Sequence, residues 1–362
     1  MRVMICGAGV IGASVAYFLA RRGLRPIVIE GTSIACAASG KSGGFLALDW
    51  CDRTPLESLA RRSFLLHARL PEQLKADWGY RRVTTYGGSG GPGIRAGGGN
   101  YEKGWLSNSI TLNHQLGSPE TTAQVHPGQF TAAMMRAAET KGAELRIGTV
   151  TGVDRTKDGA VQGVQIDGAT IAADAVVIAM GPWSTFAALG LEVPNVYGLK
   201  GHSLVYETGS RIPAEALFLE YRDASGANYS PEVFPRADGT TYVCAISSES
   251  PLPLDPTDVT PDPGAIECLE AMCAKLSPIL ATSRIIARQA CYRPVTQDGL
   301  PLIGAVQGLQ GAFIATGYSV WGILNAPATG EAMADLIIEG LAKTVDLSPF
   351  DPDRFGPVSG RF

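Results

Sequence analysis

The first thirty residues carry two apolar runs separated by a helical pattern. Val3–Cys6 is a continuous apolar run, which is typical of a parallel strand buried on both faces. A second run, at 27–29, ends at Glu30. Between the runs a helix ends at Gly23, and apolar residues recur on one of its faces: Ala13, Val15, Ala16, Phe18 and Leu19. The order strand, helix, strand predicts the opening unit of an α/β fold.

Three later segments extend this predicted α/β unit. Residues 128–153 have the pattern of a helix followed by two strands. Residues 173–184 contain a buried strand that ends at Gly181. Residues 315–340 predict a strand, a glycine-rich turn and a long helix.

Two portions of the chain follow other patterns and predict a second lobe. The first has a helix at about 56–78, a strand at 81–86 and the tract GGSGGPGIRAGGGN. We expect this tract to be a mobile loop, either a lid or a surface excursion. The second portion, 195–295, alternates in strand fashion, with a hairpin turn at Asp238–Gly239 and a helix at about 263–276. It predicts an antiparallel sheet.

Composition and charge narrow the classes of function. The 362 residues are 45% apolar, and the net charge of −4 leaves no basic footprint for nucleic acid. The seven cysteines are scattered without a CxxC pair, which argues against zinc or disulfides and favours a cytoplasmic location. The chain enters a strand at once and has no long apolar run, so we expect neither a signal peptide nor a membrane span.

A G-x-G-x-x-G motif follows the first strand as Gly7, Gly9 and Gly12. The first glycine suits a tight turn, the second lets the backbone approach a pyrophosphate, and the third lets the helix pack on the strand. The helix N-terminus then faces the phosphates. Glu30 is placed to bind an adenosine ribose and disfavours the 2′-phosphate of NADP. The motif by itself leaves NAD and FAD open.

The segment after Glu30 is a long loop of small residues, GTSIACAASGKSGGFLALDW. An NAD dehydrogenase would normally continue with another helix and strand at this point. Glycine and serine alone would also suit a flexible linker. This loop, with ADAVVIAMGPWS and ATGYSVWGILNAPATGEAMADLIIEG, resembles the D-amino-acid oxidase/glycine oxidase superfamily of FAD-dependent amine oxidoreductases. The segment SGKSGGFLALDWCD also resembles a fungal and plant branch of FAD-dependent oxidoreductases.

The resemblance implies an α/β fold in which a Rossmann-like FAD-binding domain is interleaved with an antiparallel-sheet substrate domain. The FAD-binding domain is expected to be discontinuous, with residues 1–50, 126–194 and 296–362, and the substrate domain to hold 51–125 and 195–295. The loop after the second strand is expected to wrap the pyrophosphate of FAD and to run along its isoalloxazine ring.

The resemblance also assigns residues to FAD. Val150 would lie beside the adenine, and Trp183 would either cover the cofactor or belong to the core. The turn at 317–323 would face the flavin pyrimidine ring, where a helix N-terminus stabilises negative charge. The family usually has histidine where this chain has Tyr318. The expected cofactor-binding residues are Gly7, Gly9, Val10, Ile11, Gly12, Glu30, Gly31, Ser39, Gly40, Lys41, Ser42, Gly43, Gly44, Val150, Gly181, Trp183, Gly317, Tyr318, Trp321, Gly322 and Ile323.

Four residues are candidates for substrate chemistry. Arg293 of CYRP matches the family arginine that binds a substrate carboxylate, although a structural ion pair is the alternative and Asp298 is the nearest acid in sequence. Glu232 would favour a cationic substrate or would lie at a solvated rim. Lys41 is a weaker candidate, for flavin reoxidation. Cys291 matches the position of the flavin-linked cysteine in monomeric sarcosine oxidase-like proteins.

The reaction implied by the resemblance is oxidation of the C–N bond of an amino acid or related amine to an imine. Hydride would pass to flavin N5, and dioxygen or another electron acceptor would reoxidise the flavin. Three alternatives stay open at this point. They are a flavin-dependent tRNA-modifying oxidoreductase, a non-catalytic flavoprotein with a regulatory or trafficking role, and an NAD dehydrogenase.

Overall fold

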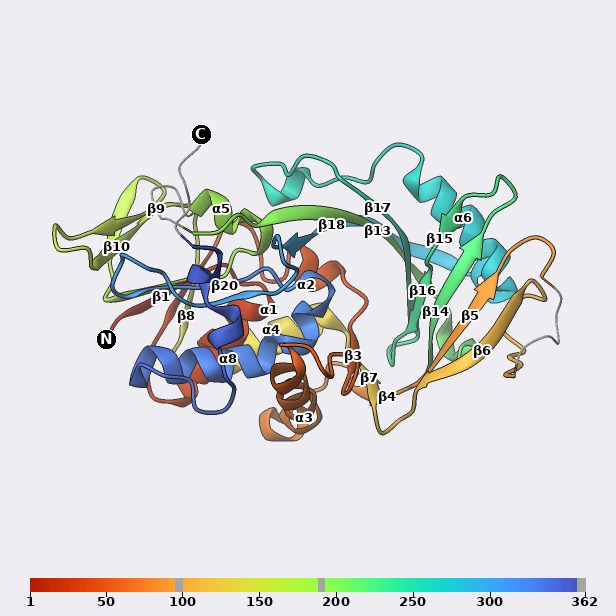
Figure 1. Cartoon of the computed structure of the whole chain (residues 1–362), viewed down its shortest axis with the longest axis horizontal. Coiled ribbons are helices and arrows are strands. Elements are labelled where there is room, and N and C mark those ends of the chain that lie inside the picture. Colours follow the sequence, from red (N-terminus) through yellow and green to blue (C-terminus); the bar gives the residue numbers. More distant parts are fainter. Residues whose placement is uncertain (95–99, 188–192, 357–362) are drawn as a thin grey trace.

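A six-stranded sheet organises the half of the molecule that contains the N-terminus and helix α8 (Gly322–Glu339) (Figure 1). The computed structural model describes residues 1–94, 100–187 and 193–356. The strands are parallel except for the edge strand β19, which is antiparallel to β20. Their order is β19 (Leu302–Ala305), β20 (Ala312–Thr316), β12 (Ala175–Ile178), β1 (Val3–Cys6), β2 (Ile27–Glu30) and β8 (Glu144–Ile147).

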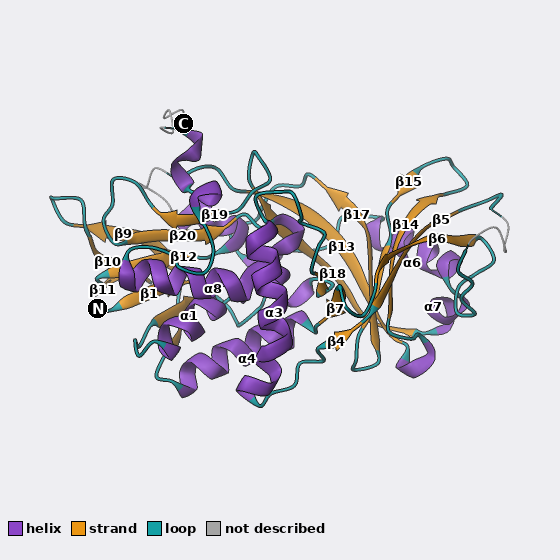
Figure 2. Cartoon of the chain, turned by 60° about the horizontal axis from the view of Figure 1, so that its bottom comes forward, coloured by secondary structure: helices purple, strands orange, loops and turns teal. Residues whose placement is uncertain are grey.

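The two faces of this sheet pack against different layers (Figure 2). Val3 and Ile5 of β1 pack with the helices α1 (Val10–Arg21), α4 (Pro127–Thr140) and α8 (Gly322–Glu339). Met4 and Cys6 point the other way, because side chains alternate along a strand. They belong to the core under a three-stranded sheet of β9 (Val150–Arg155), β10 (Val161–Ile166) and β11 (Ala169–Ala172). Burial on both faces explains the continuous apolar run of β1.

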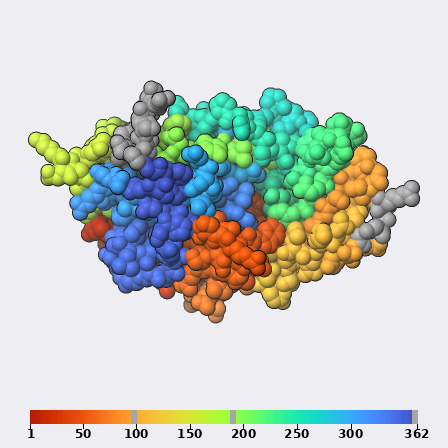
Figure 3. All heavy atoms as spheres, viewed as in Figure 1, coloured from red at the N-terminus to blue at the C-terminus, as the bar shows by residue number. Residues whose placement is uncertain are grey.

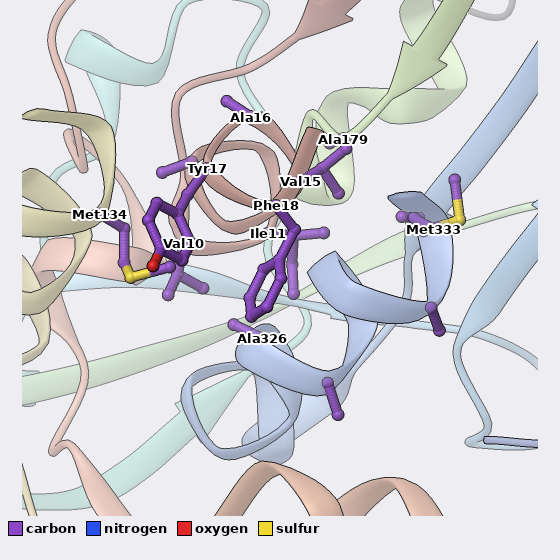
Figure 4. Close-up of a cluster of buried hydrophobic side chains, with 14 of the residues drawn as sticks. Val10, Ile11, Val15, Ala16, Tyr17, Phe18, Met134, Ala179, Ala326 and Met333 are labelled. Carbon is purple, nitrogen blue, oxygen red and sulfur yellow. The ribbon is translucent and has the colours of Figure 1, made fainter. Parts of the chain in front are cut away.

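Helix α1 is the centre of the helical layer, and its apolar side chains meet Met134 of α4 and Ala326 of α8 (Figure 4). Glycines allow this close packing. A Cβ at Gly12 would lie 1.9 Å from the carbonyl oxygen of Gly7, and a Cβ at Gly330 would lie 2.7 Å from the backbone of Ser14. The third glycine of the motif therefore serves the helix–strand contact, as predicted.

The second half of the molecule is built on an eight-stranded sheet (Figure 1). The helices α6 (Ala265–Leu276) and α7 (Pro278–Thr282) cover one of its faces. The order is β18 (Arg284–Val295), β13 (Tyr197–Glu207), β17 (Thr240–Ser248), β16 (Glu232–Pro235), β14 (Glu215–Arg222), β5 (Thr84–Gly90) and β6 (Ile110–Gly117), with β15 (Asn228–Tyr229) paired to β14. All of its neighbours are antiparallel except β14 and β5, which are parallel.

Shorter elements join the two halves. A small sheet contains β3 (Phe45–Ala47), β7 (Thr122–Gln124) and β4 (Arg81–Arg82). Helix α3 (Glu57–Leu74) lies at the surface as an orange patch beside blue C-terminal residues (Figure 3). The remaining helices are α2 (Ala38–Lys41), α5 (Ser184–Ala187) and the 3₁₀ turns η1 (Gly181–Trp183), η2 (Gly209–Arg211), η3 (Pro256–Asp258), η4 (Ser319–Trp321), η5 (Ser348–Phe350) and η6 (Pro352–Phe355). None of the helices in the described ranges is long and apolar enough to cross a membrane.

The structure departs from the predicted elements in three places. The strand expected at 81–86 is split into β4 and β5, and β5 continues through Gly90, into the tract expected to be a loop. Gly88 explains this, because a Cβ there would lie 2.1 Å from the carbonyl oxygen of Thr111 and would keep β5 and β6 apart. Residues 95–99 of that tract lie outside the described residues. The loop after Glu30 contains the short helix α2.

Helix α3 bears on the predicted domain limits. It lies in the segment that we assigned to the substrate domain, 51–125. Its buried side chains Leu59 and Phe64 belong to the same core as α1 and α8. The limits of the two domains stay a prediction.

Candidate functional site

A cavity of about 720 Å³ lies where the carboxyl ends of β1, β2, β12 and β20 meet the inner face of the eight-stranded sheet. Ligands of doubly wound α/β sheets bind at such carboxyl ends. Gly12, Gly40, Lys41 and Gly317 are predicted site residues that do not line the cavity. The predicted residues that do line it are Gly7, Gly9, Val10, Ile11, Glu30, Gly31, Ser39, Ser42, Gly43, Gly44, Val150, Gly181, Trp183, Glu232, Arg293, Tyr318, Trp321, Gly322 and Ile323.

The N-terminus of α1 forms one end of the cavity. Gly7 has φ +105°, and a Cβ on it would lie 2.6 Å from the carbonyl oxygen of Ala179. The backbone N–H of Val10 donates to Ser39 Oγ at 2.9 Å, which ties α1 to the loop after β2. The first turn of α1 carries no acidic residue. Because the N–H groups of a first helical turn have no helical acceptor, this end of the cavity suits an anion.

Glu30 holds the glycine loop together. Its Oε2 accepts from the backbone N–H of Ala8 at 2.8 Å, and its Oε1 accepts from the N–H of Thr32 at 3.0 Å. A carboxylate has about four acceptor positions, so these bonds leave capacity for a ligand hydroxyl. The predicted contact of Glu30 with a ribose stays a prediction.

The loop between Ser39 and Gly44 is shaped by close approaches. A Cβ at Gly40 would lie 2.2 Å from the carbonyl oxygen of Ala35, and one at Gly43 would lie 2.3 Å from the Phe234 ring. Gly44 has φ +81°. Gly40 therefore shapes the loop from outside the cavity wall. The loop is tightly packed, which argues against the flexible-linker alternative.

Lys41 ends α2 and stands behind the cavity wall rather than on it. Its carbonyl oxygen accepts from Gln289 Nε2 at 3.1 Å, so its backbone joins the loop to β18. Its positive charge acts on the buried thiol of Cys291, whose pKa it lowers while burial raises it more strongly. The positive charge of Lys41 therefore acts electrostatically on Cys291 in the cavity wall, although Lys41 itself does not line the cavity.

The opposite side of the cavity is formed by the turns after β12 and β20. Trp183 is buried and lines the cavity, and its Nε1 donates to the carbonyl oxygen of Pro253 at 2.8 Å. Gly317 has φ +83° and packs against Thr296, so it forms the turn from behind. The turn leads directly into α8, whose first turn carries no acidic residue.

The first turns of α8 are held by two side chains of α3. Pro327 lies inside α8 and has no N–H to donate to the preceding turn. His67 Nε2 lies 2.9 Å from the carbonyl oxygen of Ile323 and 3.2 Å from that of Leu324. The N–H of Ala328 donates instead to Ser63 Oγ at 2.9 Å. His67 is fully buried, and desolvation lowers its pKa to about 4, so the ring is neutral at pH 7.

These features fit an FAD molecule. The glycine loop leaves space where a Cβ at Gly9 would lie 3.0 Å from Ser39 Oγ. Ser42 Oγ is buried on the wall and has no hydrogen-bond partner in the described part of the chain, so it is available to a polar ligand. The N-termini of α1 and α8 are both free of acidic side chains and suit a phosphate and an electron-rich ring respectively.

Arg293 projects from β18 toward the neighbouring strands of the eight-stranded sheet. Its Nη1 donates to Ser247 Oγ of β17 at 2.9 Å. To reach β17 it crosses β13 at Gly201, where a Cβ would lie 3.3 Å from Arg293 Nη2. A bare backbone at Gly201 therefore makes room for the guanidinium.

Arg293 has no carboxylate partner among the described residues. The acid nearest in sequence, Asp298, binds Arg354 instead, at 2.7 Å. The structural ion pair considered for Arg293 is therefore absent from this part of the chain. A guanidinium on a cavity wall without a carboxylate is an anion site that still has donors to offer.

Glu232 lies on the same wall, on β16. Cys244 Sγ donates to Glu232 Oε2 at 3.5 Å. Burial raises the pKa of Glu232, while the charge of Arg293 and the thiol of Cys244 lower it. Glu232 is half-buried in the cavity wall, so the alternative of a solvated rim residue does not fit.

Four aromatic side chains, Phe45, Trp50, Phe218 and Phe234, form an aromatic wall that the sequence did not predict. Their ring centroids lie 4.8 to 5.4 Å apart, and all four line the cavity. Alternation along each strand would have placed Phe218 and Phe234 on sheet faces. It could not have shown that β3, β14 and β16 bring these faces together.

Comparisons with known proteins agree with this geometry. The family described as DAO, FAD dependent oxidoreductase, matches residues 2–336. A Schizosaccharomyces pombe protein named "Putative oxidoreductase C1F5.03c" is 29% identical, and the match covers 97% of both chains. The glycine oxidase of Geobacillus kaustophilus is 28% identical over 97% of this chain and 96% of the relative. Its crystal structure has a TM-score of 0.79 at 26% identity and covers 98% of this chain and 99% of that one.

These matches confirm the predicted family resemblance, the fold class, the cofactor FAD and the oxidoreductase class. The alternative of an NAD dehydrogenase is therefore wrong. The chain belongs to the DAO family of FAD-dependent oxidoreductases.

Proposed function

We propose that the chain oxidises the Cα–N bond of an amino acid whose carboxylate binds Arg293. The observation that carries this proposal is the cavity-facing guanidinium without a carboxylate partner among the described residues. Glycine oxidase relatives support amino-acid oxidation over tRNA modification or a non-catalytic role. The net charge of −4 also argues against a nucleic-acid substrate.

The residues of the chain supply binding, orientation and exclusion of water. FAD, when bound, accepts the hydride that leaves the substrate Cα–H bond. Arg293 is suited to a two-pronged grip on the carboxylate, which fixes the direction of that bond. The aromatic wall keeps water out of the reacting end of the cavity. The imine product then leaves and is hydrolysed in water.

The aromatic wall also indicates the kind of substrate side chain. Phe218 and Trp50 approach within 4.8 Å between ring centroids and offer an apolar surface. An amino acid with a bulky apolar side chain would bury that surface, whereas glycine would leave it exposed. We therefore infer a preference for bulky apolar amino acids over glycine.

The second half of the reaction returns the flavin to its oxidised form. Dioxygen or another electron acceptor would take the electrons from the reduced flavin. Release of hydrogen peroxide during turnover would identify dioxygen as the acceptor. Lys41, whose charge reaches the wall at Cys291, is our candidate for assisting this step. Lys41→Met is expected to slow flavin reoxidation more than flavin reduction, and equal effects on both would refute that role. The cytoplasmic location stays a prediction.

The test is an anaerobic titration of the FAD-loaded protein with a panel of amino acids and amines, followed by flavin absorbance. We expect apolar amino acids to bleach the flavin and the corresponding decarboxylated amines to do so poorly. Arg293→Met should raise the KM for amino acids by at least about a hundredfold, because a charged hydrogen-bond pair is lost, while Arg293→Lys should lose less. A flavin that amines reduce as well as amino acids would refute the carboxylate site.

A further inference from the structure

Two opposite charges, those of Arg293 and Glu232, lie on the same cavity wall but form no ion pair with each other among the described residues. The guanidinium of Arg293 and the carboxylate of Glu232 both line the cavity, and neither enters any ion pair of the described residues. Buried charges are normally paired, because an isolated charge in a protein interior is costly. A cation and an anion on one wall, neither in an ion pair, indicate a ligand that carries both a negative and a positive charge.

Strand register brings the two charges to the same strand. Arg293 crosses from β18 over β13 to bind Ser247 of β17, and Glu232 lies on β16 directly opposite Cys244 of β17. Cys244 and Ser247 pair with Ser203 and Gly201 of β13 across an irregularity in the register, so they lie about two strand positions, or about 7 Å, apart. The two hydrogen-bonding partners therefore hold the charges over one short segment of β17.

An amino acid is of a size to bridge two groups held over this short segment. Its carboxylate and ammonium groups are joined through Cα, and two charged hydrogen bonds of about 2.8 Å extend the span to about 8 to 9 Å. The substrate carboxylate then occupies the Arg293 side and the ammonium group the Glu232 side. The residue directly opposite Glu232 on β14 is the uncharged Phe218.

We propose that Glu232 binds the ammonium group of the substrate and accepts one of its protons. This inference rests on the proposed function, because it requires an amino acid on Arg293. In the step, one N–H bond of the ammonium group breaks and an O–H bond forms on Glu232. The nitrogen lone pair that is released becomes available as the Cα–H bond transfers its hydride. Loss of the hydride from the neutral amine gives a protonated imine, and the proton on Glu232 stays there until this iminium product leaves and then passes to water.

The surroundings of Glu232 suit this exchange. The groups that act on it are the thiol of Cys244 from β17 and the guanidinium of Arg293 from β18; β14 presents the uncharged Phe218. Tyr242 and Cys291, also on this wall, are kept neutral because burial raises the pKa of each. Burial raises the pKa of Glu232 as well, which makes its carboxylate a better proton acceptor than an exposed one.

The first test measures binding without turnover. 2-Aminoisobutyrate is an amino acid without a Cα–H bond, and pivalate has the same shape without the amine. Calorimetry on the FAD-loaded protein should show the amino acid binding about tenfold to a hundredfold tighter, the effect of one charged hydrogen bond. Glu232→Gln should remove this preference and should keep the binding of pivalate.

The outcomes separate the two proposals. Equal affinity for the two probes in the wild-type protein overturns the role of Glu232, even if amino acids reduce the flavin. A preference that survives in Glu232→Gln overturns it as well. A wild-type protein that binds neither probe overturns the carboxylate site on Arg293, and with it the proposed function.

The second test follows the pH dependence of anaerobic flavin reduction with the amino acid that reduces the flavin best. Glu232→Gln should fall at least about a hundredfold at pH 7 and regain about tenfold per pH unit, because only the neutral amine then reacts. Cys244→Ala should move the acid limb to higher pH, since the thiol lowers the pKa of Glu232. The matched control is Cys268→Ala. Cys268 lies on helix α6, and its thiol donates a hydrogen bond to the hydroxyl of Tyr229. An unchanged profile in both Glu232→Gln and Cys244→Ala refutes the proton transfer.

Discussion

Replacing the buried histidine His67 should change how the stability of the protein depends on pH. Its Nε2 donates to the carbonyl oxygens of Ile323 and Leu324, which Pro327 and Ala328 leave without their usual helical donors. His67→Gln keeps an N–H donor at the end of a side chain of similar length but cannot take up a proton. The substitution therefore tests protonation separately from the loss of the hydrogen bond.

The magnitude follows from the pKa of His67. Burial lowers it from 6.5 to about 4, so between these values the unfolded chain binds a proton that the folded chain does not. The contribution is present above pH 6.5 and is lost as the pH falls. Since each pKa unit corresponds to about 1.4 kcal/mol, the full effect is about 3 kcal/mol, of which about 2 kcal/mol falls between pH 7 and pH 5.

The assay is denaturant unfolding of the FAD-loaded protein at pH 7 and pH 5. We expect the free energy of unfolding of the wild-type protein to fall by about 2 kcal/mol more than that of His67→Gln over this interval. His114→Gln, which alters an exposed histidine, is the control and should keep the wild-type pH dependence. If wild type and His67→Gln lose the same free energy, the reasoning about the buried neutral ring is refuted.

Three further predictions concern the cofactor and the substrate. Gly12→Ala should lower the free energy of unfolding by at least about 3 kcal/mol and weaken FAD binding, because the added methyl group would lie 1.9 Å from the carbonyl oxygen of Gly7. The control is Gly104→Ala, whose methyl group would meet nothing within 4 Å, and equal melting temperatures for the two variants would contradict the packing argument. Phe218→Ala should lower kcat/KM for bulky apolar amino acids by about tenfold to a hundredfold and leave that for alanine nearly unchanged, whereas equal losses would argue against the aromatic wall as the side-chain site. Because burial raises the pKa of Cys291 and disfavours its thiolate, acid precipitation should release the FAD into the supernatant, and a yellow pellet would show a covalent link.

The dinucleotide-binding half could be predicted from the sequence alone, and the resemblance of the loop after Glu30 to a known family added FAD as its cofactor. Strand, G-x-G-x-x-G motif, helix and Glu30 are contiguous, and each of their roles depends on a local conformation or a local contact. The strands at 197–207 and 216–221 were likewise visible, because alternation of apolar residues is a local property. Arg293 could be singled out by its motif, but its surroundings could not.

Which side chains share the cavity wall follows from the packing of distant elements and could not be predicted from local patterns. Asp298 binds Arg354 rather than Arg293, and the strand order β18-β13-β17-β16 places Glu232 and Arg293 on the same cavity wall. The support of α8 by His67 depends on a helix more than 250 residues earlier in the chain. Strand order, register and helix packing join residues that are far apart in sequence, and a local pattern carries no information about its distant partner. The grouping of the charges and the aromatic wall to which we assign substrate binding therefore came from the fold.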